Sequence, residues 1–174
     1  VDVEQQKVRK IALEWSVKNF QKLHYSNEVS KISNCLSIFK EVNSHFKYIS
    51  DPKNQEYFTP AYEVLESFKV DNMLKGDCDE HALLMVSLIK NVGGSTRLIR
   101  TKKHIYPELL IGNKKDFEKI KYYITYHWFP QILNVDNIYY HIDAKGRIWL
   151  NLDYTASYPG GSFMEDEIIG ILEI

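Results

Sequence analysis

The most informative stretch of this sequence is KGDCDEHALL, residues 75–84, which places one of only two cysteines at the start of an apolar helix. Asp77 is a good N-cap residue, and Glu80 three positions later completes a capping box, so Cys78 is predicted to be the first helical residue. The unpaired amides and the positive dipole end of such a first turn favour an anion. The pattern therefore predicts a thiolate nucleophile at Cys78 rather than a packing residue.

The composition is that of an ordinary globular domain. The chain has 174 residues, a length that suits one domain with a sizeable hydrophobic core. Hydrophobic residues make up 44% of the chain and charged residues 26%. A formal net charge of -1 provides no positive electrostatic potential that would attract phosphate backbones, so no nucleic-acid partner is predicted. No apolar run approaches the roughly 20 residues that cross a bilayer, so no membrane segment is predicted in this chain, although a start at Val1 is compatible with a trimmed anchor.

The two cysteines, Cys35 and Cys78, cannot form the disulfide framework that small secreted domains need. Cysteine usage therefore does not indicate the cellular compartment, which stays unknown. Cys35 lies beside Leu36 and Phe39 at helical spacing and is predicted to be a core residue.

Helical periodicity dominates the first half of the chain. Apolar residues recur at helical spacing from Val3 to about Leu23 and again from Ile32 to about Tyr48, which predicts two helices. Thr59-Pro60 is an N-cap followed by a proline and starts a short third helix. The helix from Cys78 to about Lys90 is apolar nearly all round, and Gly93-Gly94 stops it. This helix is expected to be the central one.

Short β-type runs follow the glycine pair. They are predicted strands of an antiparallel sheet and cover residues 96–100, 104–111, 138–142 and 147–152, with a hairpin turn at 143–146. Residues 116–124 have a weak helical pattern and are expected to cross outside the sheet. Helices first and a small sheet afterwards predict an α+β fold, in which the nucleophile helix packs on a C-terminal antiparallel β-sheet.

A thiol nucleophile needs a base within hydrogen-bond reach and a third group that orients the base. The predicted sheet segments supply His104, His127 and His141, and Asp153 follows the last apolar strand. His81, one turn after Cys78 on the same helix face, is expected to be a solvated side chain. These residues leave the choice of base open.

Three segments resemble the transglutaminase-like superfamily, whose papain-like core places a Cys at a helix start, then a His on one strand and an Asp on a later one. The segments are GDCDEHALL at 76–84, with GGSTRLI at 93–99 after it, then HIYPEL at 104–109 and WLNLDYT at 149–155. The resemblance covers roughly residues 59–161. It implies a single domain over 1–174, with a helical N-terminal extension over 1–56 and a transglutaminase-like core over 57–174.

By this resemblance Cys78 is the nucleophile, His104 the general base and acid, and Asp153 the group that fixes the imidazole tautomer. The implied reaction is cysteine-dependent acyl transfer on peptide or protein amides through a thioester, which ends in hydrolysis or in transamidation. No cofactor is predicted. No metal is predicted either, because helix capping explains the acidic residues around Cys78 better than ligation does. The alternative function is a catalytically inactive module of the same fold that binds a peptide or protein.

His127 is the rival base, because the residues after it also fit the family's strand pattern loosely. His104 is preferred, since Glu108 matches that pattern better and the His104 strand directly follows the strand at 96–100. His141 fits less well, because the predicted hairpin pairs it with Ile148 or Trp149, short of the aspartate.

Overall fold

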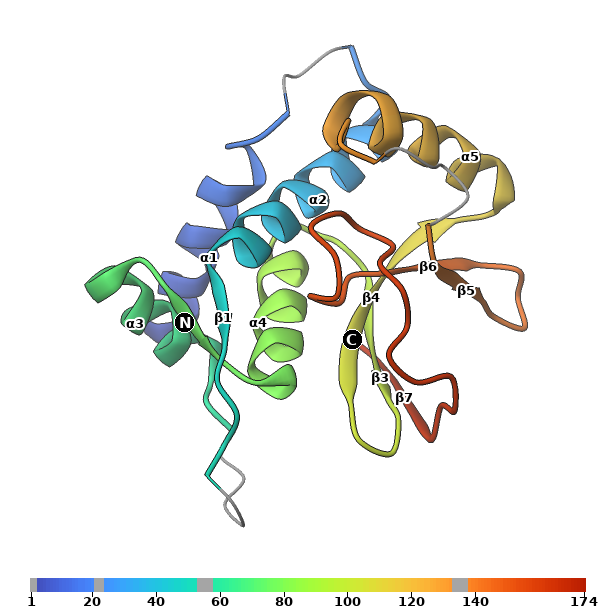
Figure 1. Cartoon of the computed structure of the whole chain (residues 1–174). Coiled ribbons are helices and arrows are strands. Elements are labelled where there is room, and N and C mark those ends of the chain that lie inside the picture. The colour runs from blue at the N-terminus through green and yellow to red at the C-terminus, as the bar shows by residue number, and fades with distance from the viewer. Residues whose placement is uncertain (1–2, 21–23, 53–57, 133–137) are drawn as a thin grey trace.

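The structure is a computed structural model that describes residues 3–20, 24–52, 58–132 and 138–174 (Figure 1). Its elements are α1 Val3–Ser16, α2 Asn27–His45, β1 Phe46–Tyr48, α3 Ala61–Asp71, β2 Leu74–Gly76, α4 Cys78–Asn91, β3 Thr96–Arg100, β4 Ile105–Gly112, α5 Lys114–Tyr123, a π-helical turn Ile124–Trp128, β5 Tyr140–Ile142, β6 Ile148–Asn151 and β7 Gly170–Glu173. Within the described ranges, none of the helices combines the length and the apolar character that a membrane span requires.

The helix that begins at Cys78 lies between a helical layer and a sheet. The sheet has the strand order β5-β6-β4-β3-β7, and each neighbouring pair is antiparallel. Helix α4 packs against β3 and β4, and it also contacts α1, α2 and α3, as Figure 1 shows. The predicted α+β class, with this helix on a C-terminal antiparallel sheet, is confirmed.

One hydrophobic core joins the helical layer to the sheet. Leu84 and Leu88 of α4 are completely buried, and they belong to the same cluster as Trp15 of α1 and Leu150 of β6. Cys35 of α2 is also completely buried there, and burial raises the pKa of its thiol to about 12. The predicted core role of Cys35 is confirmed.

The first two helices differ from their predicted lengths. The predicted end of the first helix, Leu23, lies outside the described residues, and α1 itself ends at Ser16. Helix α2 ends at His45 rather than near Tyr48, because Phe46 adopts extended backbone angles (φ -76°, ψ 129°). The segment after His45 forms β1, which pairs in parallel with β2. Tertiary pairing thus overrides the apolar periodicity at the end of this helix.

The strand β7 and the π-helical turn were not predicted from the sequence. The edge strand β7 pairs with β3, but it is only four residues long and offers too few positions for a periodic signal. The predicted crossing helix is present as α5 and continues into the π-helical turn that carries His127. The expectation that a strand carries His127 is therefore wrong.

A buried ion pair lies within the sheet. Arg97 of β3 and Glu108 of β4 are in register, and Arg97 Nε donates to Glu108 Oε2 at 2.7 Å. The other carboxylate oxygen is bonded to Nδ1 of His141 at 2.5 Å, and the guanidinium lies 4.4 Å from the ring centroid of Trp149. Two hydrogen-bonded contacts and one cation–π contact thus join β3, β4, β5 and β6.

We expect Glu108→Ala to lower the free energy of unfolding by about 3–5 kcal/mol, because it leaves the buried Arg97 guanidinium without its counter-charge. Urea denaturation followed by circular dichroism measures the change. Glu173→Ala is the matched control, since that exposed β7 carboxylate pairs with Arg147 and should cost less than about 1 kcal/mol. Equal losses in the two variants would contradict the assignment.

Candidate active site

The start of α4 is held by the predicted capping box. The side chain of Asp77 accepts a hydrogen bond from the amide of Asp79 at 2.9 Å, and Glu80 Oε2 accepts one from the amide of Asp77 at 3.0 Å. Glu80 Oε1 also accepts from the amide of Thr59 at 2.9 Å. A Cβ on Gly76 would lie 2.4 Å from Glu80 Cβ, so only glycine permits this close approach. The prediction that Cys78 is the first residue of α4 is confirmed.

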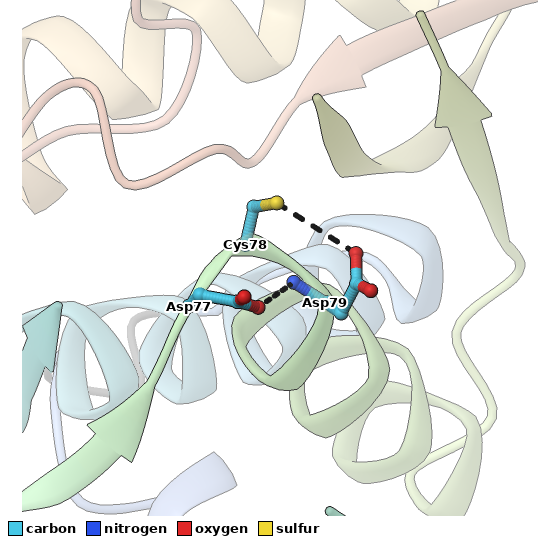
Figure 2. A group of neighbouring side chains, drawn as sticks. All are labelled: Asp77, Cys78 and Asp79. Atoms are coloured by element: carbon cyan, nitrogen blue, oxygen red, sulfur yellow. Dashed lines mark hydrogen bonds between the residues drawn. The ribbon is translucent and has the colours of Figure 1, made fainter. Parts of the chain in front are cut away.

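The Cys78 side chain projects away from the helix, while Asp77 folds back over the first turn (Figure 2). The residue is half-buried, and its thiol donates to Asp79 Oδ1 at 3.6 Å. The sulfur sits at the N-terminal end of a 14-residue helix, which is the positive end of the helix dipole. Cys78 thus has both the access and the electrostatic setting of a reactive thiol.

The structure brings His104 and Asp153 into direct contact. His104 Nε2 and Asp153 Oδ2 lie 2.6 Å apart, and both side chains are buried. The other oxygen of Asp153 accepts from the amide of Tyr154 at 2.8 Å, and the amide of Asp153 donates to Asn151 Oδ1 at 3.0 Å. Pairing of β4 with β6 produces this contact, because His104 directly precedes β4 and Asp153 closely follows β6.

The His104 ring also reaches the sulfur of Cys78. Burial lowers the pKa of His104, but hydrogen bonds to the Asp153 carboxylate and to the Cys78 sulfur outweigh burial and raise it from 6.5 to about 9. Because Nε2 is engaged by Asp153, Nδ1 is the nitrogen left for the sulfur. The three residues named from the sequence therefore form one chain of contacts, in which an imidazolium persists at neutral pH.

The other strand-region histidines lie elsewhere. His127 is exposed on the π-helical turn, where its ring is 5.4 Å from that of Tyr122 and 5.5 Å from that of Tyr123. His141 is opposite Trp149 in the β5–β6 hairpin, as predicted, and is bonded to Glu108. His104 is therefore the ring that contacts Asp153, and His127 and His141 lie elsewhere.

His81 is a buried neighbour of the site, which the sequence did not indicate. The expectation of a solvated side chain is wrong, because His81 is 0% exposed and its Nε2 lies 2.7 Å from Asn43 Oδ1 of α2. Burial, assisted by the charge of His104, lowers the pKa of His81 to about 3. Its ring contacts those of Phe46 and Tyr154. Segments distant in the sequence create this environment by packing against α4, so no local sequence signal could have revealed it.

Three side chains at the helix start are close enough to be considered as metal ligands. In the described part of the chain, the ligand atoms of Asp77, Cys78 and Asp79 lie within 4.8 Å of one another. Both acidic groups already have other roles, since Asp77 caps the helix and Asp79 accepts from the thiol (Figure 2). Capping accounts for this acidic cluster, which gives no independent sign of an ion.

The cleft in front of the thiol has a volume of about 1010 Å³. Its lining carries acidic groups on the α4 side and basic groups on the β3–β4 turn. The lining residues are Tyr48, Asp51, Pro52, Phe58, Asp77, Cys78, Asp79, Arg100, Thr101, Lys102, Lys103, His104 and Ile105. A cleft of this volume lies at the upper end of the range for ligand-binding pockets.

Comparison with known proteins gives weak similarities. No protein-family model matches the chain, and no curated protein matches its sequence. Among solved structures, it is similar to calcium-bound LapG of Legionella pneumophila, with a TM-score of 0.38 and 15% identity over 94% of this chain and 80% of that one. EGTA-treated LapG gives 0.37 and 16%, over 94% and 77%. A "Putative Cysteine Protease from Cytophaga hutchinsonii" gives 0.41 and 16%, over 98% and 50%.

We expect the ring of His104 to titrate well above 6.5, and Asp153→Asn to lower its pKa by at least about one unit. The neutral amide no longer stabilises the imidazolium, so the ring loses its proton at lower pH. NMR titration of the ring Hε1 signals measures both values. The signals of His127 should be the same in the two proteins, and an unchanged His104 titration would contradict the proposed contact.

Proposed function

We propose that this protein is a cysteine-dependent acyl-transfer enzyme that acts on peptide or protein amides, of the transglutaminase-like peptidase or amidase type. The observation that carries the proposal is the 2.6 Å contact between His104 Nε2 and Asp153 Oδ2, in a ring that also hydrogen-bonds to the Cys78 sulfur. Thiol catalysis requires a nucleophile in contact with a base, and a third group that orients the base. The open cleft in front of Cys78 supports access for a chain segment.

The reaction begins when the Cys78 thiolate attacks the carbonyl carbon of the amide. The carbonyl π electrons move to oxygen, and the tetrahedral intermediate then expels the amine, which takes the proton from His104. A thioester on Cys78 and a neutral imidazole result. Water or a second amine next attacks the thioester, gives a proton to His104 and releases the acid or the new amide, with the Cys78 thiolate restored.

Each partner has a distinct electrostatic task. The Asp153 carboxylate accepts a hydrogen bond from the Nε2–H group of His104, which directs Nδ1 toward the reacting atoms and stabilises the imidazolium. The backbone amide of Cys78 is one of the helix's first four N–H groups, which lack intrahelical acceptors. It is therefore available to donate to the developing oxyanion.

We expect Cys78→Ala and His104→Ala each to reduce cleavage of a generic peptide amide by at least about 1000-fold, because each removes a partner of the covalent step. His127→Ala is the matched histidine control and should behave like the wild type. Release of a fluorogenic amine measures the rates.

Iodoacetamide labelling at neutral pH separates an enzyme from a binding module of the same fold. An activated Cys78 should label much faster than a free thiol, and Cys78→Ala reports any background labelling at the buried Cys35. An ordinary, slow labelling rate together with no amide cleavage would favour the inactive binding module.

A further inference from the structure

The region before residue 57 contributes Tyr48, Asp51 and Pro52 to the lining of the cleft. Tyr48 is the last residue of β1, and the parallel pairing of β1 with β2 places it opposite Gly76, two residues before Cys78. The ladder continues past Tyr48, where the amide of Ile49 donates to the carbonyl of Gly76 at 2.8 Å. Tyr48 is therefore held at a defined position beside the start of α4.

The Tyr48 side chain lies beside the reacting groups. It is 51% exposed and lines the same cleft as Cys78 and His104. Its ring centroid lies 5.7 Å from that of Tyr154, and the Tyr154 centroid lies 5.8 Å from that of His104. Within the described ranges, no hydrogen bond engages the Tyr48 hydroxyl, so this donor is available to a ligand in the cleft.

The charge around Tyr48 keeps its proton in place. Burial raises the pKa of Tyr48, and the negative charge of Cys78 raises it further, ahead of the contributions of nearby aspartates. The phenol therefore remains a hydrogen-bond donor at neutral pH, close to where negative charge develops during attack by Cys78.

The tetrahedral intermediate of acyl transfer needs preorganised donors aimed at its oxyanion. The Cys78 amide supplies one donor. Thr101 also lines the cleft, but its hydroxyl already donates to the carbonyl of His104 at 3.1 Å. Carboxylates on the α4 side cannot donate when ionised. Tyr48 is the neutral donor left beside the sulfur in the described part of the cleft.

We propose that the Tyr48 hydroxyl is the second oxyanion donor, acting with the Cys78 backbone amide on the carbonyl oxygen under attack. This inference rests on the proposed acyl-transfer function and assigns a catalytic role to the region before residue 57. The hydroxyl donates its hydrogen bond without transferring the proton, so it changes the barrier and not the stoichiometry.

Tyr48→Phe tests the inference, because it removes one oxygen atom from a half-exposed ring and leaves the fold unchanged. A peptide aldehyde, acetyl-Leu-Leu-argininal, adds to the thiol and forms a hemithioacetal whose oxygen occupies the oxyanion position. Iodoacetamide alkylates the same sulfur by displacing iodide and develops no oxyanion. We expect aldehyde affinity and the kcat/KM for peptide amide cleavage to fall by about 100-fold, while the iodoacetamide rate stays within about 2-fold of wild type.

Tyr126→Phe is the matched control, since this exposed tyrosine lies on the π-helical turn and should leave all three readouts unchanged. Equal aldehyde affinity and kcat/KM in Tyr48→Phe and the wild type would overturn the assignment of Tyr48 and would leave the proposed function untouched. An iodoacetamide rate that falls as much as the aldehyde affinity would also overturn it, because Tyr48 would then act on the thiol. A slow, ordinary iodoacetamide rate in the wild type would instead overturn the proposed function and this inference with it.

Discussion

The contact between His104 and Asp153 is the interaction on which the candidate site depends. Both groups are buried, so each would be costly in charged form without the other. Antiparallel pairing of β4 with β6 brings them together. Helix α4, packed on β4, then carries Cys78 to the remaining nitrogen of the ring. The sheet therefore determines where the His104 ring lies, and the start of α4 determines where the Cys78 sulfur lies.

The two N-terminal helices take part in the structure around the site. Helix α2 supplies Asn43, whose Oδ1 lies 2.7 Å from His81 behind the thiol and whose amide group donates to the carbonyl of Ala156 at 3.3 Å. This side chain links the nucleophile helix to the loop after Asp153. The predicted division between an extension over 1–56 and a core over 57–174 remains a prediction, yet both parts share one hydrophobic cluster.

Electrostatic setting distinguishes the two imidazoles closest to the start of α4. His104 gains a carboxylate and a sulfur as partners, which raise its pKa to about 9. For His81, complete burial and the charge of His104 lower the pKa to about 3, and its partner Asn43 is neutral. The His104 ring is thus suited to hold a proton at neutral pH, whereas the His81 ring stays neutral.

The sequence by itself determined the local features: the capping box that begins α4 at Cys78, the apolar central helix, and the strand at 96–100, because each depends on residues a few positions apart. It named His104 and Asp153 as candidates and favoured His104 over His127, but it could not show which ring meets the aspartate. Only the tertiary structure decided which imidazole meets the aspartate, where His81 is buried and how Tyr48 reaches the cleft. These placements depend on pairing between segments distant in the sequence, which no local pattern encodes.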